Sequence, residues 1–78
     1  MNKYILTVID HQLNPDKYTT EQLEQNADSA AAAAAAYAAH TAYTAAAADT
    51  THWLNRYFRL SGENKQDYID AINKDNKQ

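Results

Sequence analysis

The chain has no cysteine, one glycine and one proline among its 78 residues. Without cysteine, no disulfide can stabilise the fold, and nothing in the composition indicates an oxidising compartment. Pro15 and Gly62 therefore stand out as the two strongest breaks in the chain, and they divide it into three segments. All three segments belong to one domain, residues 1–78, because a chain of this length is too short for two.

The chain also has little net charge and no block of one sign. Seven basic and ten acidic residues give a net charge of −3, and they are spread along the sequence, which does not favour a nucleic-acid-binding tail. The first apolar run ends at Asp10, too early for a signal peptide. The alanine-rich run that follows is barely apolar by transfer and is interrupted by Asp28 and His40. We expect a cytoplasmic protein with no membrane association.

Large apolar side chains are scarce. Apolar residues make up 45% of the chain, but sixteen of these residues are alanine, which offers the least area to a core. A core of this size supplies roughly 3–5 kcal/mol unless something else supports it. The composition therefore predicts a homodimer, formed through the alanine-rich helix described next.

Fifteen of the twenty-two residues between Ala27 and Ala48 are alanine. Alanine has the highest helix propensity, and Thr19 with Gln22 forms a capping-box pattern ahead of the run. The sequence thus predicts one long helix over about residues 20–48. Asp49-Thr50-Thr51 could cap a new helix or lie within a continuous one, so whether residues 20–60 form one helix or two stays open.

The flanking segments also have helical patterns. Apolar residues at 5, 6, 9 and 13 share one helical face, and Asn14-Pro15 ends that short N-terminal helix. The β-branched residues there also suit a strand, but no second strand exists to pair with it. After the alanine run come an aromatic helix, a C-cap at Gly62 and a final helix over about 64–74, with 75–78 frayed.

The aromatic stripe of the penultimate segment is expected to supply the core, with Trp53 and Phe58 as its main buried side chains. Tyr68, Ile69 and Ile72 of the final helix are expected to be buried as well. The predicted fold class is all-α, a small helical hairpin or bundle built on the long helix, with a short N-terminal helix and one or two C-terminal helices.

Tyr37, His40 and Tyr43 are the bulky groups on the otherwise smooth alanine helix. They either bind a partner or supply bulk to the core, and tyrosine is frequent in binding hot spots. No nucleophile accompanies His40, so we expect no enzyme activity. The histidines and nearby aspartates are too scattered for three or four ligands, so no metal and no cofactor are expected.

A second candidate site combines Arg56, Arg59 and Lys65 with neighbouring aromatic residues. Nucleic-acid-binding proteins use such residues for phosphate contacts and base stacking. The alternative is an amphipathic helix whose arginines remain in water. Nearby acidic residues, Asp49, Glu63, Asp67 and Asp70, reduce any positive field in this region, so nucleic acid is possible but not favoured.

Two motifs flank the alanine run, Asn-Pro-Asp-Lys-Tyr from Asn14 and Trp-Leu-Asn-Arg-Tyr-Phe-Arg-Leu-Ser-Gly-Glu-Asn-Lys-Gln-Asp-Tyr-Ile from Trp53. Together with the tyrosine-spaced alanines, they resemble a group of small alanine-rich proteins of T-even-type tailed bacteriophages. The resemblance spans nearly the whole chain and brings no catalytic or binding residues with it. It implies an accessory protein made in the cytoplasm of the infected bacterium, one that binds and inhibits a host protein. A minor virion component is a weaker alternative.

Overall fold

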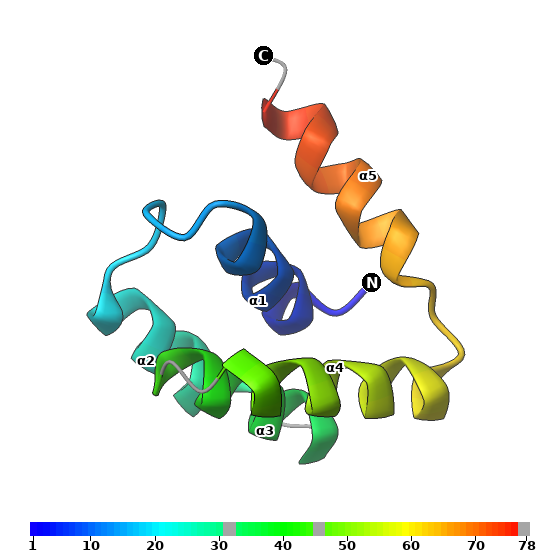
Figure 1. Cartoon of the computed structure of the whole chain (residues 1–78), viewed down its shortest axis with the longest axis horizontal. Helices are drawn as coiled ribbons and strands as arrows, with labels where there is room; N and C mark the ends of the chain where they lie inside the picture. Colours follow the sequence, from blue (N-terminus) through cyan, green and yellow to red (C-terminus); the bar gives the residue numbers. More distant parts are fainter. Residues whose placement is uncertain (31–32, 45–46, 77–78) are drawn as a thin grey trace.

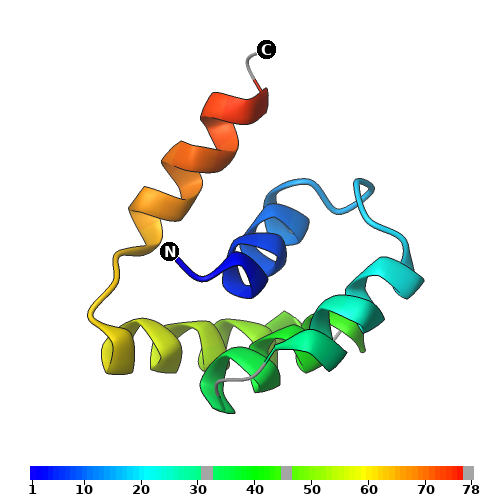
Figure 2. The same ribbon diagram turned by 180° about the vertical axis from the view of Figure 1, so that it is seen from behind.

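Five α-helices make up the computed structural model, which describes residues 1–30, 33–44 and 47–76 (Figure 1). They are α1 (Lys3–Leu13), α2 (Thr20–Ser29), α3 (Ala33–Tyr43), α4 (Ala47–Ser61) and α5 (Lys65–Asn76). Helix α3 packs against α4, α2 and α1, whereas α5 packs mainly against α1. Figures 1 and 2 show α1 between the α2–α3–α4 group and α5. These described residues contain no strand, which confirms the all-α class.

The expected single helix over residues 20–48 is wrong. Helix α2 ends at Ser29, because Ala30 has extended backbone angles of φ −70° and ψ 124°. Helix α3 ends at Tyr43 and α4 begins at Ala47, so the described residues between 20 and 60 belong to three separate helices. Residues 31–32 and 45–46, over which the expected helix also ran, lie outside the described residues. Folding the alanine segment back on itself buries its methyl groups on three neighbouring helices, which outweighs the small propensity gain of an uninterrupted helix.

The predicted helix boundaries are confirmed where the sequence carries specific capping residues. The Thr19 hydroxyl accepts from the Gln22 backbone N–H, and the Gln22 side chain accepts from the Thr19 N–H. Asn14 closes α1, just before Pro15. Gly62 has a φ of +75° after the end of α4, in the left-handed region that glycine adopts without strain.

Alanines of α3 lie in the middle of the core. Five of them are buried, and large side chains from other helices surround them. The largest fully buried side chains are Tyr68, Ile5, Ile9, Leu54 and Val8. Trp53 and Phe58 were expected to be the main core residues, but both are only partly buried at its edge. The core therefore consists of small residues of α3 enclosed by a few large ones.

Helix α5 runs two residues further than expected. It reaches Asn76, so residues 75 and 76 are helical, not frayed, while 77–78 lie outside the described residues. Tyr68 and Ile72 are buried as predicted, and Ile69 is partly buried.

Hydrogen-bonded polar groups join the helices where the core is thin. The buried Thr50 hydroxyl of α4 donates to Thr41 Oγ1 of α3 at 2.9 Å. The buried Asp10 carboxylate accepts from Lys17 Nζ at 2.6 Å and from the Tyr18 hydroxyl at 2.7 Å. Asn14 Nδ2 donates to the same carboxylate at 2.8 Å. These contacts tie the turn after α1 to that helix.

Asp10 and Tyr18 titrate outside their ordinary ranges. Burial alone would raise the pKa of Asp10, but the hydrogen bonds from Lys17, Tyr18 and Asn14 outweigh it and lower that pKa. Burial and the bond to Asp10 raise the pKa of Tyr18 to about 12. The carboxylate therefore stays charged and the phenol stays protonated at neutral pH, which keeps their hydrogen bond intact.

The helices were compared with the length and apolar character that a membrane span needs. Across residues 1–30, 33–44 and 47–76, no helix is both long enough and apolar enough to cross a membrane.

Replacing Ala35 with leucine tests the close packing of α3. Ala35 is fully buried, so the larger side chain has to displace its neighbours, at a cost of about 1–3 kcal/mol. That is a large part of the roughly 3–5 kcal/mol expected for a domain of this size. We expect a clearly lower melting temperature by circular dichroism. Leucine at the exposed Ala48 of α4 is the control, and equal melting of the two variants would contradict the packing described here.

Candidate aromatic interface

An exposed pair of stacked aromatic rings joins α3 and α4. The Tyr37 ring lies on the Trp53 ring, with their centres 4.6 Å apart and their planes 30° from parallel. Tyr37 remains 53% exposed, although it is in contact with a partly buried tryptophan. The pair therefore presents a flat apolar surface that the chain itself does not cover.

Two polar side chains of α4 border this stack. The His52 ring meets the Trp53 ring edge-on at 5.2 Å, and the Arg56 guanidinium lies 6.0 Å from the Trp53 ring centre. His52 and Arg56 are both exposed. We call these four residues, Tyr37, His52, Trp53 and Arg56, the aromatic patch. Leu60, 70% exposed, lies two helical turns beyond Trp53 on the same side of α4 and extends the apolar surface.

Ring contacts divide the predicted triad of Tyr37, His40 and Tyr43 in two. Tyr37 contacts Trp53, whereas the exposed His40 meets the partly buried Tyr43 edge-on at 6.2 Å. Sequence reasoning identified Tyr37 but assigned Trp53 to the core, because the fifteen residues between them give no sign that α4 folds back on α3. The aromatic stripe at Trp53 was the available signal.

The alternative set of Arg56, Arg59 and Lys65 is spread over two helices. Arg56 belongs to the aromatic patch, Arg59 lies in the last turn of α4, and Lys65 begins α5 beyond the Gly62 turn. All three side chains are exposed. The structure thus brings together one member of each predicted site, because Tyr37 and Arg56 both lie against the Trp53 ring.

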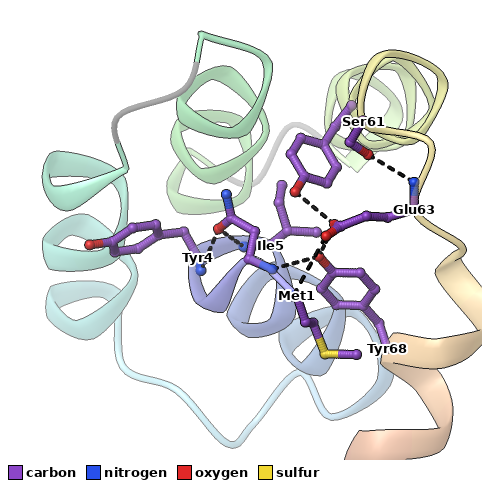
Figure 3. A network of polar contacts seen from close by, with 8 residues as sticks. Met1, Tyr4, Ile5, Ser61, Glu63 and Tyr68 are labelled. Carbon is purple, nitrogen blue, oxygen red and sulfur yellow. Dashed lines mark hydrogen bonds and ion pairs between the residues drawn. The ribbon is translucent and has the colours of Figure 1, made fainter.

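A second cluster lies at the joint between α4 and α5 (Figure 3). Its centre is the Glu63 carboxylate, which accepts from the Tyr57 hydroxyl at 2.7 Å and from the Tyr68 hydroxyl. The Met1 amino group lies 3.6 Å from the same carboxylate, and the Asn2 N–H donates to the Tyr68 oxygen at 2.8 Å. Sequence reasoning missed this cluster, because nothing in the spacing of its residues distinguishes it from ordinary helix-surface positions.

This cluster has the electrostatics of a structural joint. The hydrogen bonds from Tyr68 and Tyr57 lower the pKa of Glu63, and the nearby amino group lowers it further. Burial and the bond to Glu63 raise the pKa of both tyrosines. Protons therefore stay on the phenols and the carboxylate stays charged at neutral pH, which suits a stable contact better than proton transfer. A pocket of about 260 Å³ beside it is lined by Met1, Gly62, Glu63, Asn64, Asp67 and Tyr68.

Metal-ligating side chains do not gather in the described part of the chain. Within it, no three histidine or acidic side chains lie close enough together to hold an ion.

Comparison of the chain with models of protein families, with curated proteins and with solved structures found no match. The aromatic patch and the Glu63 cluster therefore have to be interpreted from their own geometry.

Replacing Glu63 with glutamine tests the joint between α4 and α5. Because folding lowers the pKa of Glu63, its charged form stabilises the fold above the unfolded pKa, near 4.5, and that contribution is lost as the pH falls through the folded value. We expect Glu63→Gln to melt lower than wild type at neutral pH, and the difference to shrink on acidification. Melting by circular dichroism from about pH 7 to about pH 3 measures this.

Glu24→Gln, at an exposed position of α2, is the matched control and should follow the wild-type curve. Some acid sensitivity remains in the Glu63 variant, because the pKa of Asp10 is also lowered. A constant difference in melting temperature between Glu63→Gln and wild type over the whole pH range would contradict this prediction, because it would show that the charge of Glu63 does not stabilise the fold.

Proposed function

We propose that this chain is a non-enzymatic binding protein that covers and inhibits a protein of its bacterial host through the face formed by α3 and α4. The observation that carries this proposal is the aromatic patch. Tyrosine, tryptophan and arginine are the three residue types most enriched in binding hot spots, and here they lie in one exposed cluster. The exposed His40 lies one helical turn beyond Tyr37 on α3 and meets the Tyr43 ring edge-on.

Stacking favours a binding role for Tyr37. An isolated exposed tyrosine has to lose side-chain freedom when it binds, whereas a tyrosine already stacked on Trp53 has lost part of it. The partly buried Trp53 is held in turn by the core. The patch is therefore largely preorganised, which is what a small protein needs in order to bind with a limited area.

The biological setting of this proposal comes from the resemblance to small accessory proteins of T-even-type phages. It supports a phage product that acts in the cytoplasm of the infected bacterium during host takeover or counter-defence. Inhibition requires only that the α3–α4 face cover a working surface of the host protein, with no cofactor and no metal.

Enzyme activity is not part of the proposal. In the Glu63 cluster, the pKa values of the two phenols, Tyr57 and Tyr68, are raised, which disfavours their use as nucleophiles or bases at neutral pH. Their hydrogen bonds instead join the start of the chain to the α4–α5 connection.

The homodimer predicted from composition remains part of the proposal, although the long helix expected to form it is interrupted. The buried alanines of α3 already pack within the chain, so the proposed dimer uses exposed apolar side chains outside the aromatic patch, such as Leu13. Sedimentation equilibrium at micromolar concentration measures the mass directly, and a mass of one chain would rule the dimer out.

Nucleic-acid association through Arg56, Arg59 and Lys65 is the second candidate, since Trp53 offers a stacking platform beside Arg56. Binding to phosphates weakens steeply and linearly with the logarithm of salt concentration, whereas an apolar interface responds little. A minor virion component is a third, weaker possibility, and mass spectrometry of purified particles tests it.

Replacing Tyr37 with alanine tests the proposed function. Alanine favours the helix, and Tyr37 is more than half exposed, so we expect the variant to remain folded, with only a small fall in melting temperature from the lost stack on Trp53. We also expect the tagged variant to capture much less host protein from infected cells, because loss of one hot-spot residue costs on the order of 2 kcal/mol or more.

The His40→Ala/Tyr43→Ala double variant provides the comparison, because these rings lie on the same helix but outside the stack. We expect it to reduce capture less than Tyr37→Ala does. If Tyr37→Ala remains folded and still captures every wild-type partner, the α3–α4 face is not the binding surface.

A further inference from the structure

We propose that the aromatic patch recognises a protein segment in which a carboxylate lies beside an apolar or aromatic side chain. This inference rests on the proposed function and specifies the chemistry of the partner. Its basis is the juxtaposition of a cation with a flat apolar surface, the Arg56 guanidinium 6.0 Å from the centre of a ring that is itself stacked on Tyr37.

Arg56 is available to a partner. The ion pairs within residues 1–30, 33–44 and 47–76 are Lys17 with Asp10 and the Met1 amino group with Glu63, and neither involves an arginine. Arg56 is exposed, and its planar group can form two parallel hydrogen bonds with one carboxylate. Its position beside the Trp53 ring restricts the side chain before binding, so less freedom is lost when the carboxylate arrives.

Arg59, the other arginine of the chain, has a different position. It lies in the last turn of α4, where a positive charge interacts favourably with the free carbonyl groups at the helix end. It has no ring contact with Trp53 in the described part of the chain, where Arg56 is the guanidinium found over that ring. Arg56 is therefore the residue assigned to carboxylate recognition, and Arg59 is its matched control.

The surrounding charges favour a protein carboxylate over a nucleic-acid strand. The chain has a net charge of −3, and the exposed Asp49 lies one helical turn before Trp53 on the same side of α4. A strand with a phosphate at every nucleotide would place negative charge near Asp49 as well as near Arg56. A single carboxylate next to an apolar group meets Arg56 and the stacked rings without that repulsion.

Selection of a random displayed peptide library on the immobilised full chain tests this inference. We expect the selected peptides to carry aspartate or glutamate beside leucine, phenylalanine or tryptophan. The best peptide is then made with its acid and with the corresponding amide, and both are titrated against wild type, Arg56→Gln and Arg59→Gln. Loss of the acid should weaken binding to wild type about tenfold or more, as for other hydrogen bonds to charged groups.

If the acid of the peptide contacts Arg56, the loss of affinity from removing the acid and the loss from replacing Arg56 should not add. With Arg56→Gln, the acid and amide peptides should bind alike, whereas Arg59→Gln should still distinguish them as wild type does. All three proteins should remain folded, because both arginines are exposed and their helix-end and ring contacts contribute little to stability. If Arg56→Gln folds poorly, Arg56→Lys retains the charge without the planar fork and should lose part of the discrimination.

Other outcomes overturn the inference in ways that separate it from the proposed function. Selected peptides without acids, or an acid effect that persists in Arg56→Gln, would overturn the carboxylate assignment. Binding of those peptides that still depends on Tyr37 would leave the proposed function standing. Peptides that bind Tyr37→Ala as well as wild type would overturn both.

Two further occupants are tested with the same proteins. Tight, salt-sensitive binding of a labelled oligo-dT strand that is lost in Arg56→Gln, with no peptide selected, would assign the patch to nucleic acid and overturn both proposals. A dimer in sedimentation equilibrium that Tyr37→Ala converts to monomer would assign the patch to a second copy of this chain and overturn the inference.

Discussion

The small size of the alanine side chains on α3 is the constraint on which the rest of the structure depends. Helix α3 contacts α1, α2 and α4, and its five buried alanines let those helices approach it. Larger residues at these positions would separate the neighbouring helices and open the core. The few large apolar residues of the chain can therefore enclose α3 instead of having to fill a wide interior.

Composition predicted the helical state of the alanine segment but not its division. Alanine favours a helix wherever the run is cut, so local propensity cannot indicate the position of a break. Ala30 takes extended backbone angles, and α3 packs against α2, which is a property of the assembled core and not of local propensity. Helix ends that carry specific residues could be predicted from the sequence, namely the capping box at Thr19 and the glycine at Gly62, which has a positive φ.

The candidate site was predictable in part for the same reason. Tyr37 stands out in the sequence because bulky residues are rare among the alanines, and Arg56 stands out as one of two arginines. Arg56 is also expected near Trp53, three residues earlier on the same helix, but the contact of Trp53 with Tyr37 emerges only when α4 lies beside α3. Periodicity predicts that Trp53 lies on an apolar stripe, and Trp53 does pack against the core. Periodicity cannot predict that the neighbouring helix leaves the Trp53 side chain partly exposed.

Polar contacts compensate for the thin core at the ends of the helices. Asp10 holds the turn after α1, and Glu63 holds the joint between α4 and α5, each through two or more hydrogen bonds to side chains. Helix α5 depends most on this arrangement, because it packs mainly against α1 (Figure 2). The aromatic patch, in contrast, lies on α3 and α4, the helix pair that packs most extensively. Trp53 connects the core to the aromatic patch, because it packs against the buried residues and also stacks on Tyr37. A rigid base for Tyr37 and Arg56 therefore follows from the packing of α3 and α4 and does not require α5 to be held in place.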